Sequence, residues 1–189
     1  PAISRNIPVF VKNTFNPNSF GTQIESKSFK HNGIKAVAFR KQVTIMTIES
    51  NRMLGAYGFL KQVFEVFDLY KVSIDLVTTS EVSISVTIDD SCNLQIITET
   101  LSQFSTVEIL EKQAIIACVG DRIRDNSGIA TKLFGALQDI NIRMISLGAS
   151  DVNLSIVVDE NDCLAAVQKL HDVFFTRDCT LPLFAEVQK

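Results

Sequence analysis

Two carboxylate residues in the first half of the chain, Asp75 and Glu81, have the chemistry to bind a small cation. They frame the stretch DLVTTSE, in which hydroxyl groups lie between the two acids. Asp75 falls in a β-forming segment, where Asp is otherwise depleted. We expect the two carboxylates to lie close together around a hairpin, an arrangement that suits a compact cation such as an ammonium group. Taken singly, each would also be an ordinary solvated turn residue.

The loop Ser50–Gly58 (SNRMLGAYG) suits the opposite charge, a small carboxylate. Its glycines, Gly55 and Gly58, let the backbone approach a ligand closely. A helix is expected to begin at this loop, and the free N–H groups of a helix N-terminus bind carboxylates. Many such loops are only turns, but an ammonium site and a carboxylate site together describe a free amino acid.

Other kinds of site find little support in the composition. The 189 residues carry a net charge of -3 without a Lys/Arg-rich run, which argues against nucleic acid as a partner. Two distant histidines, His31 and His171, argue against a zinc site or a His-based triad. Cys118 and Cys163 fall in apolar stretches and are expected to be buried, reduced thiols. With no signal peptide and no long apolar run, we expect a cytoplasmic protein without a membrane partner.

An internal repeat determines the expected architecture. A shift of 70 residues places Gly58–Asp89 on Gly128–Asp159 without a gap. Identical residues coincide at six positions, including Phe64 with Phe134 and Ser85 with Ser155, and many apolar positions match as well. A duplicated supersecondary unit explains this better than chance.

Each repeat reads as β-α-β-β-α-β. In the first, apolar residues recur at helical spacing from about Tyr57 to Tyr70, and Ser91 can cap a second helix. Its expected strands are Val43–Ile48, Ser73–Thr78, Val82–Ile88 and Val107–Leu110. This is the ferredoxin-like order, with two helices on one face of an antiparallel sheet, so the fold class is α+β.

The second repeat follows the same order. Its expected strands are Ala114–Val119, Ile142–Leu147 and Asn153–Val158, with apolar helical stripes from Ile129 to Ile140 and from Leu164 to Phe174. Its closing strand could come from Leu181–Val187 or from Ile34–Phe39. The first ~33 residues, with a predicted strand at Ile7–Val11, fit neither repeat and suggest a piece of another domain.

Several stretches resemble aspartate kinases of the lysine-sensitive, monofunctional type. NRMLGAYGFLKQVFEVF and KVSIDLVTTSEVSISVTID are similar to the first ACT domain of these enzymes, and NIRMISLGASDVNLSIVVD with VQKLHDVFF to the second. IPVFVKNTFNPNSFGTQI resembles the last strand and turn of their amino-acid-kinase domain. The resemblance implies a kinase-domain remnant and linker (1–33), a strand completing the second ACT domain (34–42), ACT domains at 43–112 and 113–175, and a C-terminal tail (176–189).

The resemblance also implies a function. The family phosphorylates aspartate with ATP, the first step toward lysine, threonine and methionine. The kinase domain's KFGGTS-like motif is absent, so we expect no catalysis and no cofactor in this chain alone, with ATP and Mg belonging to the kinase domain. Feedback L-lysine is expected to bind where two first ACT domains pair in a homodimer, and to inhibit the attached kinase allosterically.

The family's effector-binding positions correspond here to Met53, Leu54, Ala56, Gly58, Phe59, Leu60, Ser73, Ile74, Asp75, Thr79, Ser80 and Glu81. In this interpretation the two carboxylates hold the lysine side-chain ammonium, and some residues come from the other chain. Ala56 stands where lysine-inhibited relatives often carry Ser. A dimerisation module without a ligand therefore stays open, as does a sensor of another amino acid such as threonine, although threonine has no distal ammonium.

Overall fold

The computed structural model describes residues 2, 5, 7–24, 33–50, 57–89, 93–175 and 185–186. The chain divides into an N-terminal segment, Pro1–Asn32, and a main body, Gly33–Lys189. Within the N-terminal segment, β1 (Val9–Val11) and β2 (Thr22–Ile24) form an antiparallel pair, and the rings of Phe10 and Phe20 meet edge to face. No described helix is both long and apolar enough to cross a membrane.

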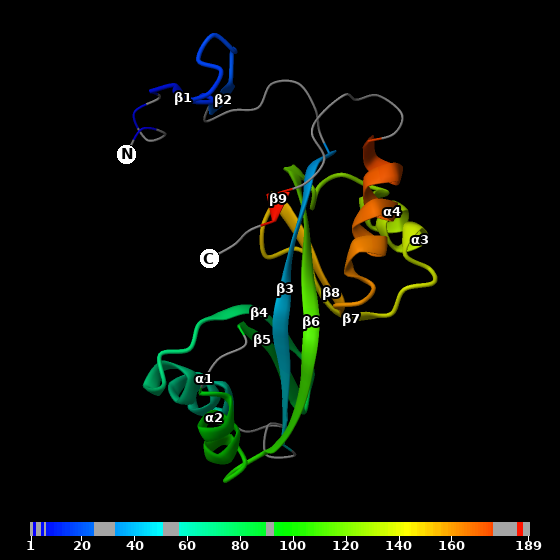
Figure 1. The fold of residues 1–189 in the computed structure, drawn as a ribbon. Coiled ribbons are helices and arrows are strands. Elements are labelled where there is room, and N and C mark those ends of the chain that lie inside the picture. Colours follow the sequence, from blue (N-terminus) through cyan, green and yellow to red (C-terminus); the bar gives the residue numbers. More distant parts are fainter. Residues whose placement is uncertain are drawn as a thin grey trace. The chain divides into compact units, whose positions relative to one another are not determined.

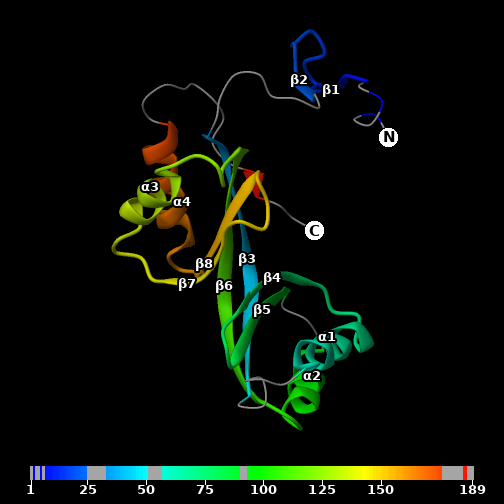
Figure 2. The same ribbon diagram turned by 180° about the vertical axis from the view of Figure 1, so that it is seen from behind.

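The main body is built around one sheet whose strands run in the order β4-β5-β3-β6-β8-β7 (Figures 1 and 2). Its strands are β3 (Gly33–Glu49), β4 (Ile74–Thr79), β5 (Ser83–Asp89), β6 (Thr106–Asp121), β7 (Ile142–Ser146) and β8 (Asn153–Asp159). The helices are α1 (Phe59–Leu69), α2 (Leu94–Leu101), α3 (Ile129–Ala136) and α4 (Cys163–Phe175). This mixed architecture of antiparallel strands with helices agrees with the predicted fold class.

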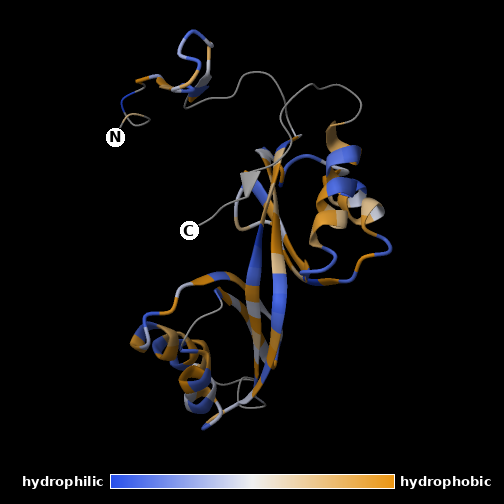
Figure 3. Ribbon diagram, viewed as in Figure 1, coloured by the Kyte–Doolittle hydropathy of each residue, from blue (hydrophilic) through white to orange (hydrophobic). Residues whose placement is uncertain are grey.

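The two long strands, β3 and β6, each serve both repeats. The second half of β3 pairs with β5 from Val43 to Glu49, and its first half pairs with β6 from Ile34 to Arg40. The sequence predicted two separate strands in each long strand, because polar residues interrupt both near the middle, as Figure 3 shows. The structure instead continues each strand through a residue with positive φ, Gln42 (58°) or Lys112 (56°).

Those two residues are related by the repeat shift of 70. Each precedes the first core strand of its repeat, and the β3–β6 pairing changes register at this point. A local bulge bends a strand without ending it, so one strand can contribute to two differently oriented half-sheets. We refer to this region, residues 40–43 and 110–113, as the junction.

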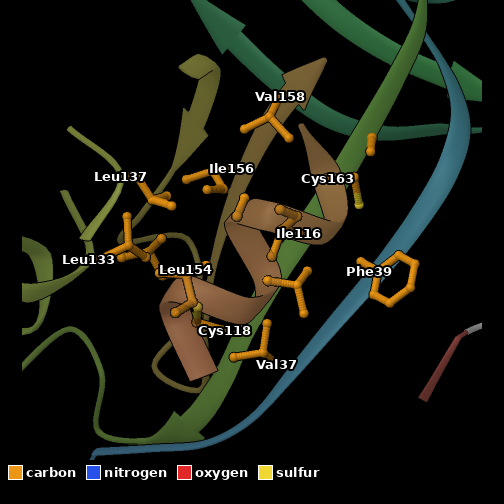
Figure 4. Close-up of a cluster of buried hydrophobic side chains, with 14 of the residues drawn as sticks. Val37, Phe39, Ile116, Cys118, Leu133, Leu137, Leu154, Ile156, Val158 and Cys163 are labelled. Carbon is orange, nitrogen blue, oxygen red and sulfur yellow. The ribbon is translucent and has the colours of Figure 1, made fainter. Parts of the chain in front are cut away.

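Each repeat has its own hydrophobic core between its helices and its half of the sheet. The first repeat buries Met46, Ile48, Phe59, Val63, Val66, Phe67, Ile84, Val86, Ile88, Ile97 and Leu101. In the second repeat, Val37 and Phe39 of β3 pack with Ile116 and Cys118 of β6 and with Leu133 of α3 (Figure 4). The strand predicted at Ile34–Phe39 thus lies in the core of the second repeat, antiparallel to β6.

Two smaller features of the main body involve an additional strand and a third hydrophobic cluster. A short strand, β9 (Ala185–Glu186), pairs in parallel with Ala38 and Phe39 on the other side of β3. On the sheet face away from the helices, Ile45 packs with Met144 and Val157, and Leu76 and Ile115 contact this small cluster. The helix-free faces of the two repeats therefore meet, and a pocket described below lies on this side.

Candidate functional site

Gly58 begins the predicted carboxylate-binding helix. It is the N-cap of α1 with φ 87° and ψ -2°, a left-handed conformation that glycine adopts at no steric cost, and its carbonyl accepts a hydrogen bond from Gln62 N at 3.1 Å. No side chain that the structure describes caps this helix end, so no described side chain competes with an anion for the first-turn amides. Phe59 is buried in the core and Leu60 is exposed beside it. Met53, Leu54 and Ala56 lie outside the described residues.

The hairpin between β4 and β5 carries the last three predicted residues. Ser80 is committed to the turn, because its backbone N–H donates to Ser83 O at 2.8 Å and its hydroxyl lies 2.7 Å from the Ser83 hydroxyl. Thr79 and Glu81 are exposed. Glu81 forms no ion pair with any residue that the structure describes.

Asp75 lies near the start of β4 and is partly exposed, beside half-buried Ile74 and exposed Ser73. The pairing of β4 with β5 changes register between Ile74 and Val77, so two consecutive residues, Asp75 and Leu76, line the same pocket. In a regular strand, consecutive side chains would point to opposite faces. Strand irregularities of this kind re-aim side chains at functional sites.

Arg40, which the sequence did not single out, binds Asp75. Its guanidinium forms an ion pair with the Asp75 carboxylate, and Nη1 lies 2.6 Å from Asp89 Oδ1 at the end of β5. The Arg40 side chain is 21% exposed, and those of Asp75 and Asp89 are 33% and 35% exposed. The Arg40 guanidinium, from the junction, is therefore already paired with Asp75, the residue predicted to bind an ammonium group.

The expectation that Asp75 and Glu81 lie close together within one chain is wrong. Asp75 and Thr79 are at opposite ends of extended β4, about 13 Å apart at the usual rise of ~3.3 Å per residue, and Glu81 lies beyond Thr79 in the turn. The prediction treated the stretch as a compact hairpin tip, whereas the strand continues to Thr79. Within one chain, the second carboxylate near Asp75 is Asp89, through Arg40.

A pocket of about 280 Å³ lies beside this ion pair. It is mainly apolar and is lined by Ala38, Phe39, Arg40, Asp75, Leu76, Ile115, Ala117 and Ser155. Its lining comes from both repeats: Asp75 and Leu76 lie on β4 of the first, and the other residues lie on the first half of β3, on β6 and on β8. The arrangement offers one charged end and an apolar floor.

The second repeat has the same scaffold without the Arg40–Asp75 ion pair. Gly128 caps α3 with φ 85° and ψ -9°, almost the geometry of Gly58. The positions of Arg40 and Asp75 are occupied by Leu110 and Ile145, so neither member of the ion pair is repeated. Asp151, at the position of Glu81, is paired with Arg124 Nη2 at 2.6 Å. A comparison of the repeats could have revealed Arg40, since it and Asp75 become apolar together.

Other chemistry is not assembled in the part of the chain that the structure describes. No group of three His, Cys, Asp or Glu side chains there could hold a metal ion. Burial raises the pKa of the Cys118 thiol to about 12, which leaves it protonated and unreactive at neutral pH. The candidate binding residues thus form two separate groups within one chain, the start of α1 and the Arg40–Asp75–Asp89 cluster.

Comparison with known proteins connects these features to one family. A sequence profile of the ACT domain matches residues 46–100 and 116–174, one match in each repeat. The chain is 40% identical over 190 residues to the chloroplastic aspartokinase 3 of Arabidopsis thaliana, which covers 94% of this chain and 34% of that protein. The chain thus spans about a third of the length of this relative.

Solved structures of aspartokinases and their regulatory domains are also similar to this chain. The crystal structure of E. coli aspartokinase III in complex with lysine and aspartate, in its T-state, superposes with a TM-score of 0.83 at 37% identity, over 93% of this chain and 40% of that one. A putative C-terminal regulatory domain of aspartate kinase from Porphyromonas gingivalis matches over its whole length and 77% of this chain, at 34% identity and a TM-score of 0.69.

Proposed function

The chain belongs to the ACT-domain family, in the tandem form of the aspartokinase regulatory regions, and we propose that it binds L-lysine as a feedback effector that inhibits phosphorylation of aspartate by ATP. In this proposal the kinase domain, with its ATP and Mg, lies in another part of a longer protein. The effector acts by binding one arrangement of the regulatory region more tightly, and a coupling of ~1–3 kcal/mol is typical of such systems.

The observation that carries the proposal is the asymmetry of the repeats. Only the first has a carboxylate, Asp75, on the strand that lines the pocket, and the second has Ile145 at that position. Duplicated scaffolds need no such charge for folding, as the second repeat demonstrates. Together with the first-turn amides of α1, Asp75 gives the first repeat one group for an ammonium and one for a carboxylate, the two charges of a free amino acid.

Lysine fits this requirement better than threonine, because only lysine has a distal ammonium. The similar E. coli aspartokinase III was crystallised with lysine, which supports the same choice. A dimerisation module without a ligand is the second candidate. It would explain the edge of β4, which among the described strands pairs with β5 alone, but it assigns no role to Asp75.

Isothermal titration calorimetry of the purified chain tests the proposal. We expect saturable binding of L-lysine and none of D-lysine or L-threonine. Asp75→Asn should remove binding, whereas the matched variant Asp151→Asn, in the corresponding hairpin of the second repeat, should leave it unchanged. A folded, dimeric chain that binds none of these amino acids would leave the dimerisation module as the function.

The position of the site between two first repeats can be tested by mixing variants. Since Asp75 and Glu81 lie at opposite ends of β4, they can hold one ammonium together only if they come from different chains. Asp75→Asn and Glu81→Gln should each abolish binding, but a randomly exchanged equal mixture should regain about one quarter of the sites, because each mixed dimer contains one intact site. No recovery, in a mixture shown to exchange chains, would contradict a shared site.

A further inference from the structure

Arg40 combines three properties, and folding alone does not explain why one residue should have all three. It is a cation on the carboxylate assigned to the effector, it lies at the junction between the repeats, and it keeps a second carboxylate partner, Asp89. The three groups carry a net charge of -1. The second repeat reaches the same fold with Leu110 at the position of Arg40, so the fold itself does not need this cation.

We propose that Arg40 is a resident competitor for the effector: its guanidinium occupies Asp75 in the free chain and must release it before the effector's ammonium can bind there. The proposal rests on the proposed function, whose cation-binding residue it concerns. Both cations need the same carboxylate oxygens, and a guanidinium fixed to the same chain is present at high effective concentration. Arg40 thereby sets the effector affinity lower than Asp75 alone would.

The release is chemically balanced. When an ammonium pairs with Asp75, Arg40 keeps its contact with Asp89 at 2.6 Å, so no charge is left without a counter-ion and the local net charge rises from -1 to zero. The pocket of about 280 Å³ beside the pair gives the guanidinium space to withdraw. Asp89 thus provides the alternative partner that makes the exchange possible.

The exchange also gives the effector access to the junction. Arg40 immediately precedes the bulge at Lys41 and Gln42, where β3 passes from the second half-sheet to the first. The ion pair joins this point of β3 to β4, a strand that is separated from β3 in the sheet by β5. Binding of the effector removes that link, so occupancy at Asp75 alters how the first repeat is held to the long strand.

The test compares L-lysine affinities of single and double variants of the full chain by isothermal titration calorimetry. Arg40→Gln removes the competing charge and should lower the dissociation constant about fivefold, which corresponds to ~0.9 kcal/mol, near the upper end for a partly exposed ion pair. Arg40→Lys keeps a cation and should remain near wild type. Arg124→Gln, which breaks the Arg124–Asp151 pair of the second repeat, is the matched control and should not change the affinity.

Asp89→Asn supplies a readout that a merely structural role would not give. Without its alternative partner, Arg40 should leave Asp75 less readily, so Asp89→Asn should weaken lysine binding about threefold in the wild-type background. In the Arg40→Gln background the same substitution should have almost no effect. This non-additivity is the signature of an exchange through Arg40.

The outcomes separate the two hypotheses. Lysine binding to the wild type with equal or weaker binding to Arg40→Gln would overturn the competition while leaving the proposed function intact, since Arg40 would then be positioning Asp75. Binding to Arg40→Gln alone would establish competition in its strongest form. No lysine binding to any variant would refute the proposed function, and the competition with it.

Discussion

The glycines that cap α1 and α3 allow one substitution to be compared in two places with the same geometry. Gly58 and Gly128 have φ values of 87° and 85°, and a Cβ added at either would meet no atom of the described residues within 4 Å. Alanine at these positions therefore encounters no clash. Its cost is the left-handed backbone conformation alone, roughly 1–2 kcal/mol.

We expect Gly58→Ala and Gly128→Ala to lower the free energy of unfolding by similar amounts. For a body of this size, ~1–2 kcal/mol corresponds to a fall in melting temperature of about 2–8 °C. Asparagine tolerates the left-handed region better than alanine, so Gly58→Asn and Gly128→Asn should lose less. If the first turn of α1 binds the effector's carboxylate, only the Gly58 variants should also weaken lysine binding.

Thermal and urea denaturation followed by circular dichroism measure the first effect, at one fixed chain concentration because the proposed dimerisation would make the melting temperature concentration-dependent. Two results would refute the reasoning. One is an alanine variant as stable as wild type, which would mean that the helix starts differently in solution. The other is an asparagine variant that loses as much as the alanine variant, since the cost would then not come from backbone conformation.

Three further predictions concern the interior and the site. Leu133→Ala, at a fully buried position of the second core, should cost about 2–5 kcal/mol in urea denaturation, and a cost under ~1 kcal/mol would contradict the packing described. The Cys118 thiol should resist iodoacetamide at pH 8 until the chain is unfolded by denaturant; rapid labelling of the folded chain would contradict its burial. Because the pKa of Cys118 is raised from 9.0 to about 12, the unfolded thiol ionises first as pH rises, so stability should fall from about pH 9 toward 12, and Cys118→Ala should fall less steeply over that range.

The periodic spacing of apolar residues predicted those helices and strands that are determined by residues close together in the sequence. The helical spacing of Phe59, Val63 and Phe67 predicted α1 to within two residues at its N-terminus and one at its C-terminus. The alternation in Val82–Ile88 predicted β5 with one residue of error at each end. Such periodicities reflect burial of one face, which any tertiary context must respect.

What the sequence did not reveal depends on distant residues or on backbone detail. Arg40 and Asp75 are 35 positions apart, and nothing in either neighbourhood indicates the ion pair. The polar junction residues Lys41 and Gln42 resemble a strand boundary, yet a positive φ lets the strand continue. Asp75 and Glu81 are separated because β4 extends to Thr79. The hydroxyl-rich residues Thr78 and Thr79 do not indicate that the strand continues this far.

The first half of β3 pairs with the second half of β6. The first repeat is therefore inserted, in sequence, between two strands of the second. On the ribosome, Arg40 emerges 75 residues before its partner Ile115, and Ile34 emerges 86 residues before Gly120. The first repeat can fold before the first half of β3 has its pairing partner in β6. Excision of residues 113–175 alone would remove Val37 and Phe39 from the core and uncover an edge of β6, inviting aggregation. The second repeat is thus completed last, and the contiguous segment 113–175 cannot be excised without losing the β3 strand that completes its core.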